Sequence, residues 1–188
     1  MVRNQNGSVL LISFTLLAIM SLLGISAMNT ARLNEKMASN YMDYKLAFQS
    51  AESGLRHTEQ WLQNHDKQVI DSEGDEQNIW LLSALDPDPR NSQFWWQERN
   101  YSWWMSNAVS WPQMDRIKTG PYTVIEYKQN MNVSPVENND IARLLYFQIT
   151  SRGTGGSDSS VVLLQSSILI GGDDNNNPRQ SWRQLEIE

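Results

Sequence analysis

The side chains best suited to chemistry are few and scattered in this chain of 188 residues. The histidines are His57 and His65, and the sequence around His57 does not form the His-Glu-x-x-His pattern of catalytic zinc sites. Cysteine is absent, which excludes disulfides, thiol catalysis and zinc sites built from thiolates. The sequence also contains no nucleophile elbow and no kinase motif. We therefore expect a protein that is not an enzyme and has no catalytic residue, cofactor or metal.

Two acidic runs, residues 71–76 and 173–177, carry oxygen ligands that a cation could use. A calcium-binding loop also requires a glycine at its sixth position. The sixth positions here are Glu76 and Pro178, so the pattern fails. The glycine-rich residues 153–156 lack the Lys-Ser/Thr pair and the helix that follow a phosphate-binding loop. We expect solvated loops at the acidic runs, with metal binding as the open alternative, and a turn at residues 153–157.

The N-terminus has the layout of a segment that is processed and anchored in a membrane. A polar leader, residues 1–7, ends at Gly7, and residues 8–31 carry no charged side chain. The core of this run, residues 8–28, is long enough as a helix to cross the roughly 30 Å hydrocarbon layer of a bilayer. Because glycine stands at the polar/apolar boundary, the favoured interpretation is a type IV prepilin signal.

Two alternatives remain for this segment. A secretory signal would have a shorter apolar stretch and a small-x-small exit, which the sequences ending at Ala27 and Ala31 loosely offer. An uncleaved single-pass anchor is the other. Its orientation is not settled by positive charges, which lie on both sides of the run. The large C-terminal part and the prepilin-like layout favour a cytoplasmic N-terminus and a periplasmic head.

One long helix is predicted from about residue 8 to residue 63. From Arg32 to Gln63 there is no proline, and the only glycine is Gly54. Apolar residues recur there at steps of three and four, which places them on one stripe: Leu33, Met37, Tyr41, Tyr44, Phe48, Ala51, Leu55 and Leu62, with Thr58 as a weak member. The first half of the helix is apolar all round, and the amphipathic second half needs a sheet or bundle on one face.

Aromatic residues concentrate after a turn-rich break at residues 86–89, and the chain holds eight tryptophans in all. Two interpretations apply to residues 94–111. They form either a packed insertion or an exposed surface that binds a protein or stacks on sugars. Under the second, the candidate partner-binding residues are Trp95, Trp96, Trp103, Trp104 and Trp111. Replacing Trp103 and Trp104 with Ala would then abolish binding and leave the domain folded.

The last third of the chain is typical of β-strands. Three are predicted, at residues 122–128, 144–152 and 161–170, as an antiparallel meander with a hairpin between the second and third. Alternation in the second strand places Leu145, Phe147 and Ile149 on one face and Tyr146, Gln148, Thr150 and Arg152 on the other. The polar tail, residues 171–188, is expected to be loosely held.

Several stretches resemble PilX-type minor pilins of type IV pili: residues 5–12, 33–40, 46–52, 146–156 and 161–166. Residues 64–120 resemble nothing in that family. The resemblance implies a pilin-like α+β fold, in which a long N-terminal helix (residues 8–63, membrane-spanning at 8–28) packs on a small antiparallel β-sheet. Residues 64–188 would form a globular head that includes the Trp-rich insertion and ends in the meander.

The resemblance also implies how the chain is processed and assembled. Prepilin peptidase would cut between Gly7 and Ser8, and the new amine on Ser8 would be methylated. The chain would be a single-pass inner-membrane protein before it joins a pilus at the cell surface. Its partners would be other minor pilins and the major pilin, through the N-terminal helix, and a PilY-type adhesin. Its role would be priming of pilus assembly, with adhesion or twitching motility. With a net charge of −6, we expect no nucleic-acid partner.

One departure from the family concerns the fifth position of the mature chain. Most pilins carry Glu there, which is understood to pair with the N-terminal amine of the subunit above, whereas this chain has Ile12. A subunit at the tip has nothing above it, so Ile12 suits a tip position. Alternatively, Ile12 is only a lipid-facing residue. The competing function is a membrane-anchored carbohydrate- or protein-binding module unrelated to pili.

We predict that Gly7→Val blocks processing of the leader. A side chain would clash where glycine leaves room for close approach of the peptidase backbone. Mass spectrometry of the mature N-terminus checks this prediction. Processing of the variant as complete as that of the wild type would contradict the prepilin interpretation.

Overall fold

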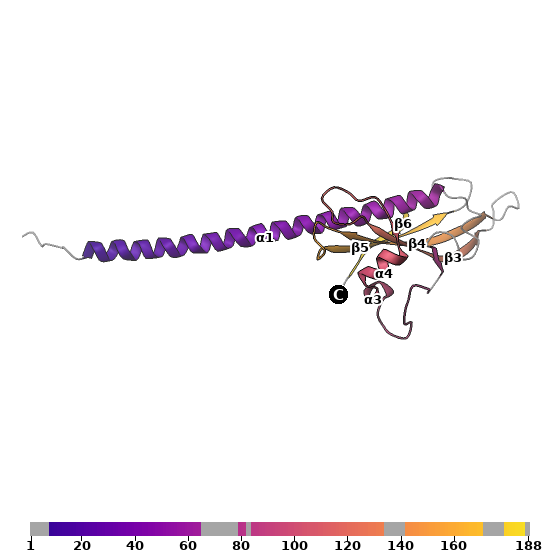
Figure 1. The fold of residues 1–188 in the computed structure, drawn as a ribbon, viewed down its shortest axis with the longest axis horizontal. Coiled ribbons are helices and arrows are strands. Elements are labelled where there is room, and N and C mark those ends of the chain that lie inside the picture. Colours follow the sequence, from indigo (N-terminus) through magenta and orange to yellow (C-terminus); the bar gives the residue numbers. More distant parts are fainter. Residues whose placement is uncertain (1–7, 65–78, 82–83, 134–141, 171–178, 187–188) are drawn as a thin grey trace, which may run out of the picture. The chain divides into compact units, whose positions relative to one another are not determined.

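The computed structural model describes residues 8–64, 79–81, 84–133, 142–170 and 179–186. Its elements, in chain order, are α1 (Ser8–Asn64), β1 (Ile79–Leu81), α3 (Trp95–Glu98), α4 (Tyr101–Asn107), β2 (Val109–Ser110), β3 (Tyr122–Val133), β4 (Ala142–Thr154), β5 (Val161–Ile170) and β6 (Arg179–Leu185) (Figure 1). The chain divides into two compact units, Met1–Met42 and Asp43–Glu188. The second is called the head unit below.

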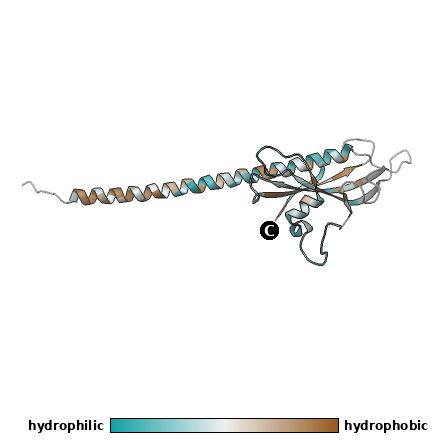
Figure 2. Ribbon diagram, viewed as in Figure 1, coloured by the Kyte–Doolittle hydropathy of each residue, from teal (hydrophilic) through white to brown (hydrophobic). Residues whose placement is uncertain are grey.

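The first unit holds the apolar part of α1. No residue of α1 before Arg32 is charged, and Figure 2 shows hydrophobic residues all along this stretch. All side chains of residues 8–42 are exposed. The few hydroxyls bond within the helix: Ser13 and Ser21 each donate to the carbonyl four residues earlier, at 2.6 and 2.8 Å. By length and composition, α1 is able to cross a membrane.

Small residues line the face of α1 that packs in the head unit. The buried residues of α1 are Ala47, Ser50, Ala51, Gly54, Leu55, Thr58 and Leu62. Their spacing of mostly three and four is that of one helix face. Of the predicted stripe, Ala51, Leu55, Thr58 and Leu62 are confirmed as buried, and Phe48 is partly buried. The earlier members are exposed: Leu33, Met37, Tyr41 and Tyr44.

The strands form one sheet in the order β1-β3-β4-β5-β6, and β2 also pairs with β3. Strands β3, β4 and β5 are consecutive and antiparallel, at the positions where the sequence predicts the meander. The alternation predicted for β4 is confirmed, because Leu145, Phe147 and Ile149 belong to the core beneath α1. The predicted α+β class, with a long N-terminal helix packed on a sheet, is therefore confirmed.

Two sequence-based expectations about the sheet are corrected. The sheet is mixed and not purely antiparallel, since β1 pairs with β3 in parallel. A parallel pair needs a crossover, and the chain between β1 and β3 supplies one that contains α3, α4 and β2. The C-terminal tail is not loosely held in its described part, because β6 pairs antiparallel with β5. Burial of Leu185, which is 5% exposed, helps to hold this strand.

Each face of the sheet has its own core (Figure 1). Residues 43–64 of α1 cover one face, where Leu55, Phe147 and Ile149 are fully buried. Helices α3 and α4 cover the opposite face, where Trp104 is 1% exposed. The head unit therefore has three layers: helix, sheet, and the segment between β1 and β3.

The backbones of α1 and of the β4–β5 hairpin are in direct contact at Gly153. A Cβ atom at this position would lie 2.3 Å from the carbonyl oxygen of Ala47 and 2.3 Å from the amide nitrogen of Ala51. Next to it, the carboxylate of Asp43 accepts a hydrogen bond of 2.5 Å from the amide of Gly156. It also accepts one from the hydroxyl of Ser157. Only glycine at position 153 permits this approach.

We predict that Gly153→Ala lowers the free energy of unfolding of the head unit by about 2–3 kcal/mol, because the added methyl group overpacks the contact with α1. The measurement is denaturant unfolding of the full chain in detergent micelles, followed by near-UV circular dichroism of the tryptophans. Gly24→Ala is the control, since a Cβ there has no neighbour within 4 Å. Equal stability of the two variants would contradict the proposed role of Gly153.

Candidate partner-binding surface

Helices α3 and α4 are fixed at their N-termini by side chains. The carboxamide of Asn100 accepts a hydrogen bond from the amide of Trp103 at 2.9 Å, which caps α4. At the start of α3, the carboxamide of Gln97 accepts one from the amide of Phe94 at 3.1 Å. These caps determine which aromatic side chains turn toward the sheet and which turn outward.

Two tryptophans form the centre of the core on this side of the sheet. Trp95 is 7% and Trp104 is 1% exposed, and their rings lie 5.7 Å apart. They pack with apolar residues of the sheet and of the preceding turn: Leu85, Val124, Leu163 and Leu185. This burial accounts for much of the aromatic content of the chain, because large rings dominate burial energy.

The expectation of a binding surface made of tryptophans is therefore corrected. Trp95 and Trp104 are core residues, so the packed interpretation applies to them, and replacing Trp104 would not leave the domain intact. The reason is that the second face of the sheet needs an apolar cover, which the sequence alone does not reveal. Trp96 and Trp103 are half-buried, and a binding role for them stays a prediction.

Trp111 connects α1 to the sheet. Its indole N–H donates to the hydroxyls of Thr58 and Thr123, at 2.9 and 2.7 Å. Its ring stacks on the imidazole of His57, with 5.5 Å between the centroids. A structural role therefore accounts for these contacts of Trp111, and a binding role for it also stays a prediction.

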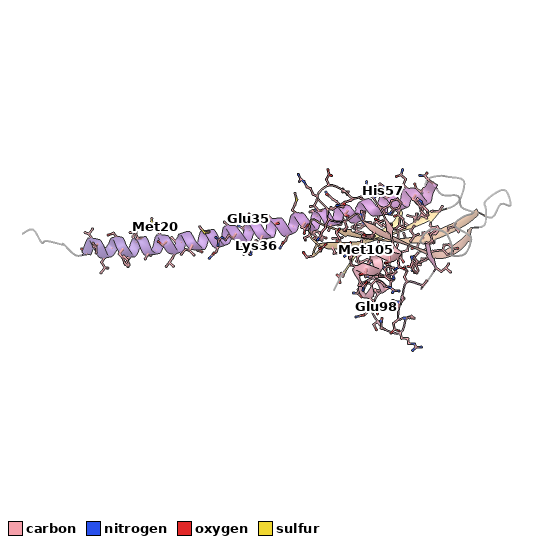
Figure 3. The ribbon with its side chains drawn as sticks, viewed as in Figure 1. Met20, Glu35, Lys36, His57, Glu98 and Met105 are labelled. Carbon is pink, nitrogen blue, oxygen red and sulfur yellow. The ribbon has the colours of Figure 1, made fainter. Side chains whose placement is uncertain are left out.

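Other apolar side chains of this region are exposed. Phe94 is 58%, Met105 56% and Tyr101 40% exposed. Phe94 stacks on Trp96 with 4.5 Å between ring centroids. Tyr101 and Met105 are one helical turn apart and lie on the same face of α4, where Figure 3 labels Met105. The outer face of α4 is therefore apolar and accessible.

Arg152 lies beside this face of α4. Its guanidinium carbon is 5.0 Å from the centre of the Tyr101 ring, and that ring is 6.1 Å from the Tyr122 ring. Burial lowers the pKa of Arg152, although Tyr101, Tyr122 and Asp158 oppose this effect. Burial, together with the hydrogen bond between the side chains of Tyr122 and Tyr101, raises the pKa of Tyr122. No motif in the sequence marks Arg152, because the contact depends on how α4 packs on β4.

The other edge of the head unit is held by an ion-pair network. Arg179 on β6 binds Glu59 at 2.9 Å and Glu52 at 3.3 Å, and both carboxylates belong to α1. The indole N–H of Trp182 also donates to Glu52, at 3.2 Å. Burial alone would lower the pKa of Arg179, but the hydrogen bonds and charges of Glu59 and Glu52 outweigh it, so this pKa is raised. The network fixes β6 to α1.

A groove of about 520 Å³ lies along α1 in the head unit. It is lined by Phe48, Gln49, Glu52, Ser53, Arg56, His57, Gln60 and Met114. The carboxylate in this groove, Glu52, is already paired with Arg179. Among the residues that the structure describes, no group of side chains is suited to a metal ion. His65 and both acidic runs lie outside the described residues.

The residues predicted to act in processing and assembly lie at the start of α1. Gly7 lies outside the described residues, and Ser8 is the first residue of α1. Ile12 is 59% exposed in the single chain. The roles of Gly7, Ser8 and Ile12 stay predictions.

We predict that Trp104→Ala destabilises the head unit by about 3–5 kcal/mol, because it removes a buried indole and leaves a cavity. Phe94→Ala is the control, since that ring is 58% exposed, and we expect a loss below about 1 kcal/mol. Urea unfolding of the full chain in micelles measures both. A Trp104→Ala variant as stable as the wild type would show that the second core is not needed for folding.

Comparison with known proteins supports an assignment for the N-terminal part of the chain. Residues 6–56 match the family model described as PilX N-terminal. No curated protein and no solved structure gives a significant match to the chain. The matched segment contains the apolar part of α1 and most of the face that packs in the head unit. The N-terminal part of the chain is therefore similar to the PilX family, and this match supports a PilX-family minor pilin of a type IV pilus.

Proposed function

We propose that this chain is incorporated at or near the tip of a type IV pilus, where it helps to prime assembly. The observation that carries the proposal is the absence of any carboxylate in residues 8–31, with Ile12 at the fifth mature position. A filament interior made of apolar helices disfavours an isolated charge by several kcal/mol. A subunit with Ile12 offers no carboxylate to the amine of a subunit above it, and the tip is the position that requires none.

The proposal includes the steps before assembly. Prepilin peptidase removes residues 1–7, and the amine of Ser8 is methylated. The apolar part of α1 anchors the chain in the inner membrane as a single pass, with a cytoplasmic N-terminus and a periplasmic head. Other pilins then bind through α1. The exposure of the side chains of residues 8–31, the uncharged run of α1, in the single chain supports this, because such an apolar surface needs lipid or other helices around it.

Adhesion or twitching motility would follow from a tip position, with a PilY-type adhesin as a further partner. The alternative function, an anchored module that stacks tryptophans on sugars, loses its main support from the burial of Trp95 and Trp104. These two rings present no free face to a sugar. We therefore keep the pilus subunit as the proposed function.

Immunogold labelling of sheared pili tests the tip position. We expect sparse label at filament ends for the wild type, and loss of most pili when the chain is deleted. Ile12→Glu supplies the missing carboxylate and should allow label along the shaft. Leu11→Glu is the matched control, because it adds the same charge one position away, on another side of α1, and should not spread the label. Even labelling of wild-type filaments would contradict the proposal.

A further inference from the structure

We propose that Arg152 and the exposed face of α4, formed by Tyr101 and Met105, are a docking surface for a protein segment that presents a carboxylate beside an apolar side chain. The partner would be another subunit of the pilus, so the inference rests on the proposed function and adds the chemistry of the contact. The surface includes none of the buried tryptophans.

The first argument is the unmet hydrogen-bonding capacity of Arg152. Among the half-buried cationic side chains in the described part of the head unit, the others donate to protein oxygens. Lys128 binds Glu126 at 2.6 Å, Arg179 binds Glu59 at 2.9 Å, and Arg99 donates to the carbonyl of Leu85 at 2.9 Å. Nη1 of Arg152, in contrast, is buried and has no hydrogen-bond partner. Because buried charges are normally paired, this guanidinium is suited to an acceptor from outside the chain.

The second argument is that Asp158, the carboxylate whose charge acts on Arg152, is already engaged. The negative charge of Asp158 raises the pKa of Arg152, but the Asp158 carboxylate forms its ion pair with Lys118. Tyr101 contacts Arg152 through the face of its ring, at 5.0 Å, so this contact does not occupy the N–H groups in the guanidinium plane, of which Nη1 has no partner. The proposed docking requires Tyr101, which is 40% exposed, to turn aside so that a carboxylate reaches the guanidinium.

The third argument concerns the surroundings of this cation. Met105 is 56% exposed and lies one helical turn from Tyr101, so apolar surface extends from the guanidinium along α4. Methionine adapts to differently shaped partners, and arginine and tyrosine are enriched where interfaces gain most of their energy. The acidic chain, with a net charge of −6, makes a polyanion a poor partner. A single carboxylate on a partly apolar segment fits both the charge and the surface.

The test is a titration of the full, isotope-labelled chain in detergent micelles, followed by the NMR signal of the Arg152 Nε–H group. The probe is the peptide acetyl-Leu-Glu-Leu-amide, and its Gln counterpart is the control. We expect a saturable shift with the Glu peptide and at least tenfold weaker binding of the Gln peptide. Sodium acetate should also bind more weakly than the Glu peptide, because it lacks the apolar groups that contact Tyr101 and Met105.

Variants separate charge, geometry and apolar contact, and the peptide's own signals report binding where the Arg152 signal is lost. Arg152→Gln should abolish binding of the Glu peptide, and Arg152→Lys should weaken it because lysine lacks the planar fork. Met105→Ser should weaken peptide binding but not acetate binding. Arg56→Gln is the matched control, since Arg56 is an exposed cation on α1. Near-UV circular dichroism checks the fold, and if Arg152→Gln does not fold, Arg152→Lys and Met105→Ser decide the matter.

Three results would overturn the inference. They are the absence of a saturable shift, equal binding of the Glu and Gln peptides, and acetate binding as strong as peptide binding, which would indicate a small-anion site. Each is independent of the position of the chain in the pilus. Even immunogold labelling along filaments would reject the proposed function and leave the titration unchanged, so the two failures are distinguishable.

Discussion

The head unit depends on one close contact, in which the backbone of α1 lies directly against the β4–β5 hairpin. Gly153 permits it, since a Cβ there would lie 2.3 Å from backbone atoms of α1. Ala47 and Ala51 on the facing side of the helix are small for the same reason, and both are fully buried. The Asp43 carboxylate then binds the turn of the hairpin through Gly156 and Ser157. In the same core between α1 and the sheet, large side chains such as Phe147 fill the remaining space.

A sheet with a helix on only one face would leave its other face in water. In this chain that face carries Val124 and Leu163, which are 1% and 3% exposed because α3 and α4 lie over them. The crossover between β1 and β3 therefore acts as a structural layer, and its tryptophans supply large apolar area from two very short helices. Trp104 belongs to this layer, whereas Tyr101 and Met105 on the same helix face away from it. The amphipathicity of α4 thus divides core from candidate surface within seven residues.

The sequence allowed the long helix, the three central strands and the alternation in β4 to be predicted, because these follow from local periodicity. The contact surface of α1 was predicted only in part: Leu55 and Leu62 stood out as apolar, but Ser50 and Gly54 did not, although spacing by three and four joins all of them. The parallel strand β1 and the strand β6 were missed. Strand β1 pairs with β3, which lies far away in the chain. Strand β6 pairs with the preceding strand β5, but its sequence is polar, and the ion pairs of Arg179 help to hold it. The site around Arg152 could not be predicted, since it arises where two elements meet.

Two positions, Ile12 and Arg152, lack a carboxylate that would pair with a positive charge, and the physical consequences differ. At Ile12 the apolar helix offers no acceptor, so a neighbouring amine that needed one would remain uncompensated in an apolar environment. At Arg152 the head unit leaves one buried donor, Nη1, without an acceptor, which favours a partner that supplies one. Under the proposed function, Ile12 disfavours a subunit whose amine would lie above it. Arg152 favours a partner that brings a carboxylate. Under the proposed function, the tip position leaves no amine to be paired at Ile12, whereas assembly supplies an acceptor for Arg152.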